Sequence, residues 1–442
     1  MAWTINNGKL YFNSVLYTGN GGTQSITGVG FQPDWTWIKS RSNSKNNAVF
    51  DAVRGVTNRL ITNTSDAQAT VSTSLTAFGT DGFSLGADTT QNANGNTFVG
   101  WNWKAAGTAP SNTYVVKVVS DSGNKYRFDD FGTSSVTLEI SEGGTFTFDQ
   151  ADSSNNGHPL RFATQADGAN SSQYTTGVTT NGTPGQAGAY TRITVAASAP
   201  TLFYYCTNHS GMGGQANTPT TNSFSNFSGS IQTNISPNTT SGFSIVTYTG
   251  QNINTIGHGL GVVPNMIISK VRNASGGWFV GLDKLGWTNR GYLESTGAWS
   301  NEPRAFYANS TAPTSTIFSQ DQSAFGAGGS ASETMVSYCF SDIQGYSKFG
   351  TYTGNGNADG TFIYTGFKPA FFLQKKSSAA GNYWNMWGYT SLSGSNTIGR
   401  RLFPNVSSAE SSQDSSPMCN FLSNGVKMLQ TDTDYNGSGA TY

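Results

Sequence analysis

Charge is scarce in this sequence: Asp, Glu, Lys and Arg make up 11% of its 442 residues, whereas about 25% is usual in soluble domains. The 24 basic and 24 acidic residues cancel, and no stripe of Lys or Arg stands out, so we predict no nucleic-acid partner. No apolar run approaches the ~18 residues of a membrane-spanning helix, so we expect no membrane span. Apolar residues at helical spacing are equally hard to find, which predicts almost no helix.

Cysteines, a secretory signal and catalytic motifs are also rare or missing. Cys206, Cys339 and Cys419 are too few for a disulfide framework. The N-terminus, MAWTINNGKLYF, lacks the basic and apolar regions of a signal, so we expect synthesis in a cytoplasm. The motifs G-x-S-x-G, the Walker loop and H-E-x-x-H do not occur, and we predict that the chain is not an enzyme.

Aromatic residues, by contrast, reach 13%, and 54 glycines stand among many Ser, Thr and Asn. β-Branched and aromatic residues separated by such clusters are typical of short strands joined by tight turns. The composition therefore predicts an all-β chain with cores of useful size, and its length suggests about three domains.

One pattern occurs three times along the chain. Each copy begins with Tyr-Thr-Gly and leads, through a turn with Gly and Pro, into an apolar strand that ends in Lys. These strands are GVGFQPDWTWIK (28–39), GLGVVPNMIISK (259–270) and YTGFKPAFFLQK (364–375). The repeats and the segments between them predict β-sandwich repeats at 1–108, 229–345 and 346–442, an inserted domain at 109–214 and a linker at 215–228.

The first two repeats close on alternating strands, at 98–103 and 335–340. Alternation places Val99, Trp101 and Trp103 on one face, which is the pattern of a half-buried sandwich strand. The third repeat reaches only 441–442, so its closing strand is expected to be missing. Either the sequence stops short of that strand or a neighbouring subunit supplies it.

The insertion contains Cys206, His209 and Met212 at the spacing C-x2-H-x2-M, in a chain with few Cys, His and Met. A thiolate, two imidazoles and a weak thioether ligand suit copper, and His158 is the natural second imidazole. Zinc is disfavoured because a thioether is a poor zinc ligand. The alternative is a buried thiol beside ordinary loop packing.

Residues 111–214 resemble the cupredoxin family in this motif and in the strand pair VTLEISEGGTFTF (136–148). The resemblance implies a Greek-key sandwich that holds one type 1 copper ion through His158, Cys206, His209 and Met212. A proline after His158 and a long polar stretch depart from the family pattern. The copper then serves electron transfer or, in a fibre, acts as a structural staple.

The motifs FDxVRG (50–55), DGFxLG (81–86) and SKFGxYTGNG (347–356) are similar to those of tail-fibre-like and virion-associated repeat proteins of marine tailed phages, including cyanophages. The resemblance implies jelly-roll or concanavalin-A-like sandwiches in tandem. It implies a virion protein made in the host cytoplasm, namely a tail fibre or appendage that displays receptor- or glycan-binding sandwiches.

Two alternatives remain open: a capsid decoration protein without receptor specificity, and a copper electron carrier fused to adhesive domains. The partners expected are other virion proteins, a host surface glycan or receptor, and further copies of the chain, with a trimer the expected homo-oligomer.

Overall fold

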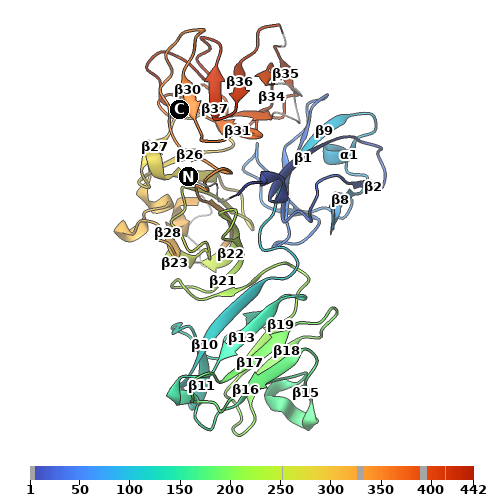
Figure 1. The fold of residues 1–442 in the computed structure, drawn as a ribbon, viewed down its shortest axis with the longest axis vertical. Helices are drawn as coiled ribbons and strands as arrows, with labels where there is room; N and C mark the ends of the chain where they lie inside the picture. Colours follow the sequence, from blue (N-terminus) through green and yellow to red (C-terminus); the bar gives the residue numbers. More distant parts are fainter. Residues whose placement is uncertain (1–4, 251, 326–332, 389–395, 414) are drawn as a thin grey trace. The chain divides into compact units, whose positions relative to one another are not determined.

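The computed structural model describes residues 5–250, 252–325, 333–388, 396–413 and 415–442, and over these ranges the chain is nearly all β (Figure 1). The predicted near absence of helix is confirmed, with 41% of residues in strands and 6% in helices. Within these ranges no helix has the length and apolar character to cross a membrane. The chain forms two compact units: unit 1 comprises Met1–Ala105, Pro237–Asn254 and Leu260–Tyr442, and unit 2 comprises Ala106–Ser236 and Thr255–Gly259.

The helical segments are single turns or little more. They are α1 (Thr89–Asn92) and the 3-10 helices η1 (Gly8–Leu10), η2 (Ser153–Asn155), η3 (Ala166–Ser171), η4 (Asp283–Leu285), η5 (Pro303–Ala305), η6 (Ala308–Ser310) and η7 (Gln322–Phe325).

Repeat one, which ends at Ala105, forms two sheets. Its strands are β1 (Phe12–Thr18), β2 (Gln24–Ile26), β3 (Trp35–Ser40), β4 (Ala48–Asp51), β5 (Asn58–Ile61), β6 (Ala69–Thr70), β7 (Leu75–Gly79), β8 (Gly82–Leu85) and β9 (Thr97–Trp103). The large sheet has the order β1-β9-β3-β4-β5-β6, and the small sheet has the order β2-β8-β7. The closing strand β9 therefore lies between β1 and β3.

Repeat two, from 237 to 345, uses the same order. Its strands are β22 (Phe243–Gly250), β24 (Met266–Val271), β25 (Trp278–Leu282), β26 (Asn289–Tyr292), β27 (Ser300–Asn301), β28 (Ile317–Asp321) and β29 (Glu333–Phe340). They pair as β22-β29-β24-β25-β26-β27. The closing strand β29 occupies the place that β9 has in repeat one.

Repeat three, from 346 to 442, is built from shorter strands. They are β30 (Phe362–Tyr364), β31 (Phe371–Gln374), β32 (Asn385–Gly388), β33 (Thr397–Ile398), β34 (Arg400–Arg401), β35 (Ser411–Ser412), β36 (Cys419–Leu422) and β37 (Gly425–Met428). Its small sheet has the order β30-β37-β36-β33, while β31 pairs with β32 in a sheet of two.

The strand register is the same in all three repeats. Tyr17 lies opposite Phe98 in the first, and Tyr248 opposite Met335 in the second. In the third, Tyr352 and Tyr442 exchange backbone hydrogen bonds of 3.1 and 2.9 Å. The alignment of 441–442 with the start of a closing strand, made from the sequence, agrees with this pairing.

The three repeats share one hydrophobic core, to which each of them contributes buried side chains. Trp101 comes from β9, Tyr338 from β29 and Met386 from β32. The opposite face of β9 is also buried, since Phe98 belongs to a second core under the small sheet. The prediction that β9 is half-buried was therefore wrong: Gly100 and Asn102 face protein on their side as Trp101 does on its own.

Equivalent lysines at the ends of β3, β24 and just after β31 join the repeats in a closed ring. The Nζ of Lys39 in repeat one donates to Ser407 O in repeat three (2.7 Å). The corresponding bonds join repeats two and one, from Lys270 Nζ to Ser65 O (3.2 Å), and repeats three and two, from Lys375 Nζ to Thr296 O (3.3 Å). Burial lowers the pKa of Lys39 to about 7 and those of Lys270 and Lys375 to about 8.

A second set of contacts follows the same ring. In each repeat a buried side-chain N–H group donates a hydrogen bond to a backbone carbonyl oxygen of the preceding repeat. That carbonyl belongs to the residue two positions after a strand arginine, which is Arg401, Arg59 or Arg290. The three bonds are Asn47 Nδ2 to Phe403 O (3.0 Å), Trp278 Nε1 to Ile61 O (2.8 Å) and Trp384 Nε1 to Tyr292 O (2.8 Å). The three interfaces are thus versions of one interface, which closes on itself within a single chain.

Unit 2 contains two sheets of five strands. Its strands are β10 (Ser111–Ser120), β11 (Asn124–Phe128), β12 (Leu138–Glu139), β13 (Thr145–Asp149), β14 (Leu160–Ala163), β15 (Gln173–Tyr174), β16 (Val178–Asn181), β17 (Tyr190–Thr194), β18 (Leu202–Cys206), β19 (Gly214–Asn217) and β20 (Phe224–Asn226). Strands β21 (Thr233–Asn238) and β23 (Ile253–Gly257) each contain a boundary between the units. The two sheets are β11-β10-β13-β17-β16 and β12-β19-β18-β14-β15, and the eleventh strand, β20, pairs with β21.

The core of unit 2 lies between these sheets and is rich in aromatic rings. Phe148 of β13 contacts Phe162 of β14 at 5.3 Å between ring centroids, and Phe128 of β11 contacts Tyr204 of β18 at 5.1 Å. The linker predicted at 215–228 was wrong, because β19 and β20 lie in this range and belong to the unit. Several of the polar residues that suggested a linker are buried in the structure, among them Asn222, Ser223 and Ser225.

We expect buried Lys39 to make unit 1 more stable as the pH rises from about 7 towards 10. The unfolded chain keeps this lysine protonated up to its ordinary pKa of about 10.4, whereas the folded protein releases the proton from about pH 7. The unfolded state then binds more protons, so the free energy of unfolding increases with pH in this window. Relative to Lys39→Met, the wild type should gain stability with a slope approaching one proton.

Urea unfolding followed by tryptophan fluorescence measures this, because all ten tryptophans belong to unit 1. Lys9→Met, at an exposed position, is the control and should differ from the wild type by the same amount at every pH. A pH-independent difference for Lys39→Met as well would show that the folded protein keeps this ammonium charged.

Candidate metal centre

Two neighbouring strands of unit 2 bring the predicted ligands together. His158 lies two residues before β14, and Cys206 is the last residue of β18. The strands are antiparallel, with Leu160 opposite Cys206. The turn before β14 and the loop after β18 therefore meet at the same end of the sheet, and this loop contains His209.

The three side chains form a compact group. Cys206 Sγ lies 3.8 Å from His158 Nδ1 and 3.7 Å from His209 Nδ1. The imidazole centroids are 4.6 Å apart, and the ligand atoms all lie within 4.8 Å of one another. Among the described residues, no other set of three or more His, Cys, Asp or Glu side chains is gathered in this way.

The fourth predicted ligand, Met212, is buried in the loop between β18 and β19, at 1% exposure. Its carbonyl oxygen accepts hydrogen bonds from Tyr126 N (2.9 Å) and Ser135 Oγ (3.1 Å). The loop is thereby tied to β11. The structure thus gathers three of the predicted ligands and places the fourth in the loop that follows them.

Glycine is required at two points of this loop. Gly211 has φ +71°, in the left-handed region that side chains with a Cβ rarely adopt. Gly213 passes so close to the carbonyl oxygen of Tyr204 that an added Cβ would collide with it. The prediction that glycines let the ligand loop turn tightly holds at Gly211, and at Gly213 the cause is a close backbone approach.

The electrostatics favour neutral imidazole at His158. Burial lowers the pKa of His158 below its ordinary value, and the neighbouring His209 lowers it further. Burial raises the pKa of the Tyr126 phenol, and the adjacent Cys206 adds to this shift. Cys206 is 4% exposed whereas His209 is exposed, so the group lies at the rim of the unit. A neutral imidazole is the form that ligates metals.

Two residues that the sequence did not point to hold the backbone at His158. Tyr126 Oη and Gln150 Nε2 both donate to its carbonyl oxygen, at 2.8 and 2.9 Å. A further bond, from Asn208 Nδ2 to Gly157 O (2.8 Å), links the two ligand loops. Tyr126 precedes His158 by 32 positions, and no spacing or motif marks such a contact in the sequence.

The donor set and its spacing fit a metal ion. A sulfur and a nitrogen 3.7 to 3.8 Å apart suit an ion bonded at about 2.3 Å to sulfur and about 2.0 Å to nitrogen, with about 120° between the bonds. Thiolate with two imidazoles in a trigonal arrangement is the set that copper takes in blue-copper sites. Cys206, His158 and His209 therefore have the donor atoms and the spacing to hold a metal ion, and copper is the candidate that their chemistry favours.

Fold and site together define a nearly all-β protein in which a ring of three repeats is interrupted by a unit with a candidate metal centre. The chain belongs to the family described as "Domain of unknown function (DUF7483)", which matches residues 7–129 and 214–442. The unmatched stretch, 130–213, contains all four predicted ligands. No curated protein matches the chain, and no solved structure does.

We predict that the purified protein binds one equivalent of Cu(II) and shows an intense visible thiolate charge-transfer band. Cys206→Ala should abolish the band, since it removes the sulfur ligand. Met212→Leu should retain the band at a shifted wavelength, because a weak axial ligand tunes the site without holding the ion. Absorption spectroscopy with elemental analysis measures both.

Cys339→Ala is the matched control, because Cys339 is also a buried free thiol but lies in β29 of unit 1. It should leave the band unchanged. A wild-type protein that takes up no copper and shows no band, or loss of the band in Cys339→Ala, would contradict the assignment.

Proposed function

We propose that this chain is a non-enzymatic display protein of a tailed-phage particle, a tail fibre or appendage whose repeats present binding surfaces to a host glycan or receptor. The observation that supports this most is the closed ring of three repeats around one core. Such a ring is a rigid platform, since each repeat is held by both others. Its loops are then free to vary for binding without loss of the core.

We further propose that the repeats are jelly-roll or concanavalin-A-like sandwiches and that unit 2 is a cupredoxin-like Greek-key sandwich. In support, repeat one buries a core between a six-stranded sheet and a three-stranded sheet. In unit 2, two five-stranded sheets enclose an aromatic core and the ligands lie at one end.

The metal proposed for unit 2 is one type 1-like copper ion, held by Cys206 and the two imidazoles with Met212 as a weak axial ligand. A bound copper ion would supply one-electron chemistry. Cys206 would bind as thiolate, and Tyr126 and Gln150 would hold His158 in place through its carbonyl oxygen. The ligand loops before β14 and after β18 would be joined through the ion, which suits a structural staple.

The second candidate function is that of a copper electron carrier joined to adhesive repeats, and the exposure of His209 favours it. An exposed ligand at the rim brings the ion close to a redox partner. Reversible reduction of the charge-transfer band at a defined potential distinguishes a carrier from a staple, whose ion would be lost or unchanged on reduction.

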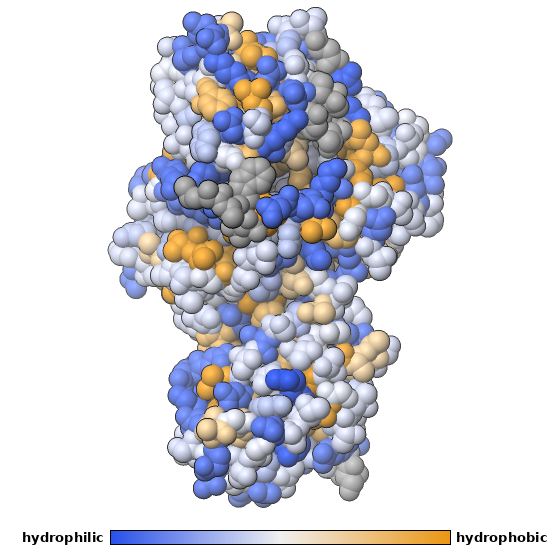
Figure 2. All heavy atoms as spheres, in the orientation of Figure 1, coloured by the Kyte–Doolittle hydropathy of each residue, from blue (hydrophilic) through white to orange (hydrophobic). Residues whose placement is uncertain are grey.

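The closed ring within one chain bears on the predicted trimer of chains. Three equivalent interfaces already close within one chain, so another copy is not needed to complete them. On the face drawn in Figure 2, hydrophobic residues form separate groups among hydrophilic ones, as on a solvent-facing surface. We propose that other virion proteins, rather than this ring interface, determine the copy number on the particle.

The test uses washed particles from cells that carry this gene, together with the purified protein. We expect the chain among the particle proteins by mass spectrometry, and saturable binding of the purified protein to host cells or to a glycan array without release of modified sugar. Absence from washed particles would refute the virion role. Presence on the capsid without glycan or cell binding would favour a decoration protein.

A further inference from the structure

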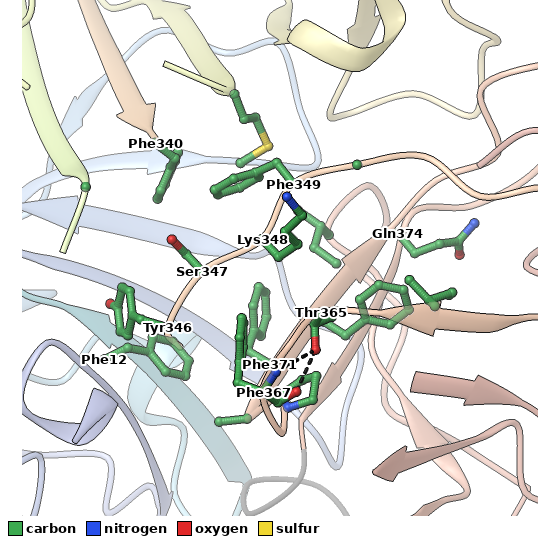
Figure 3. A pocket seen from close by; sticks show the side chains of 18 of the residues that line it. Phe12, Phe340, Tyr346, Ser347, Lys348, Phe349, Thr365, Phe367, Phe371 and Gln374 are labelled. Carbon is green, nitrogen blue, oxygen red and sulfur yellow. Dashed lines mark hydrogen bonds between the residues drawn. The ribbon is translucent and has the colours of Figure 1, made fainter. Parts of the chain in front are cut away.

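Two features of the structure lie outside the function proposed above. In unit 1, aromatic side chains from all three repeats, among them Phe12, Phe340 and Phe371, line a cavity of about 910 Å³ (Figure 3). In unit 2, the helical turn η3 lies in the long polar stretch that was noted in the sequence. The cavity is defined by its walls alone, whereas the hydrogen bonds of η3 show which part of the protein it acts on.

The turn η3 folds back over the strand that ends in Cys206. Gly168 of η3 packs so closely against the ring of Tyr205 that an added Cβ would lie 2.6 Å from it. Tyr204 points into the aromatic core, so its neighbour Tyr205 points away from the core on the other side of β18. The turn therefore covers the outer side of β18 directly beside the predicted sulfur ligand.

Asp167 connects this turn to the ligand loop. Its carboxylate accepts a hydrogen bond from Gly211 N at 2.9 Å. Asp167 has φ +52° and Gly168 has φ +67°, so two successive residues take the left-handed conformation. A residue other than glycine keeps such a conformation only where its surroundings hold it there. The bond to Gly211 is one of the contacts that do so.

The other polar group of Gly211 is also bonded to a charged side chain. Lys125 Nζ, from β11, donates to the carbonyl oxygen of Gly211. The N–H group thus meets a carboxylate and the carbonyl group meets an ammonium, and hydrogen bonds to charged groups are the stronger kind. Strand β11 belongs to one sheet of unit 2, and η3 follows β14 of the other. The tip of the ligand loop is therefore tied to both sheets.

The place of Gly211 in the loop gives these two bonds their significance. His209 lies two residues before it, and Met212 follows it directly. His209 is exposed whereas Cys206 is buried, so the loop borders the site on the side that solvent reaches. Movement of Gly211 would carry both predicted ligands with it, because only one or two peptide bonds separate them.

We propose that Asp167 and Lys125 are positioning residues of the candidate metal centre, which hold His209 and Met212 in place through Gly211. The inference rests on the copper site proposed for unit 2. It gives the polar stretch a role, since its turn η3 fastens the ligand loop from outside. Removal of such an outer hydrogen bond typically weakens metal binding by about 10- to 100-fold.

The test compares the full chain with Asp167→Ala, which removes the acceptor, and with Asp167→Asn, which keeps an acceptor oxygen. In the metal-free protein, hydrogen exchange measured by mass spectrometry should show residues 207–213 opening about tenfold more often in Asp167→Ala. After loading with Cu(II), this variant should release copper to an excess of chelator about tenfold faster or more. Asp167→Asn should resemble the wild type in both measurements.

Lys125→Met removes the second bond and should change both measurements in the same direction. Asp129→Ala is the matched control. The Asp129 carboxylate also accepts from a backbone N–H group, that of Val115 (2.8 Å), but Asp129 follows the other end of β11. This variant should leave the exchange of residues 207–213 and the release of copper unchanged.

Unchanged exchange in Asp167→Ala, or faster exchange without faster release of copper, would overturn the proposal. Equal effects of Asp129→Ala would do so too, since they would indicate a general loss of stability. A wild type that takes up no Cu(II) would instead refute the metal proposed for unit 2, and the positioning role with it. The exchange result would then still decide whether Asp167 holds the loop.

Discussion

The shared core of the three repeats is the constraint on which unit 1 depends. The large sheet of repeat one buries one face under its own small sheet and the other in the core that all three repeats share. No repeat can bury that second face alone, and exposing it would cost the hydrophobic stabilisation of several aromatic side chains. The repeats are therefore parts of one folding unit, unlike domains that happen to share a sequence pattern.

Buried lysines give the ring its specificity. Removing an ammonium group from water is costly unless it gains hydrogen bonds, and Lys39, Lys270 and Lys375 each obtain one from a loop of the neighbouring repeat. A repeat that slipped along its neighbour would leave such a group unpaired. We infer that the lysines oppose alternative packings, a role that buried polar groups have in some proteins.

From the sequence, the strand register of the repeats could be predicted more accurately than the burial of their strand faces. Aligned Tyr-Thr-Gly motifs and alternating strands were enough to place Thr441 and Tyr442 at the start of a closing strand, because strand alternation follows from backbone geometry alone. The sequence did not show that both faces of strand β9 are buried. Asn102 looks like a solvent-facing residue, but it is buried and satisfied by Thr36 Oγ1 and by the carbonyl oxygens of Asn13 and Gly100.

A motif can also be recognised in a sequence before the contacts of its residues are known. FDxVRG (50–55) was noted in the sequence only as a motif, and the structure supplies a physical reason for two of its residues. Asp51 and Arg54 form a fully buried ion pair, and Tyr338 of repeat two donates to the same carboxylate at 2.7 Å. Since breaking a buried pair leaves an uncompensated charge, both residues are constrained together.

In the candidate metal centre, too, local spacing was predictable and long-range contacts were not. Local spacing predicted Cys206 and His209, while His158 followed from the scarcity of histidine and the family resemblance. Tyr126 and Gln150, which hold His158 through its carbonyl, depend on the pairing of distant strands and left no mark in the sequence. These two residues orient His158 by donating hydrogen bonds to its carbonyl oxygen. Any residue with a hydrogen-bond donor in the same place would do this.

The insertion is compatible with the ring because of where the chain leaves and re-enters unit 1. Asn238 Nδ2 donates to the carbonyl oxygen of Ala105 (3.0 Å), so the crossings at 105–106 and 236–237 are adjacent. The chain crosses between the units again at 254–255 and 259–260. On the side of unit 2, Ala106 N donates to Ser236 Oγ (3.2 Å). A unit whose ends lie this close can be accepted between two repeats without opening their interface. The family match stops at 129 and resumes at 214, so it covers part of unit 2 but not the stretch that contains the candidate metal ligands.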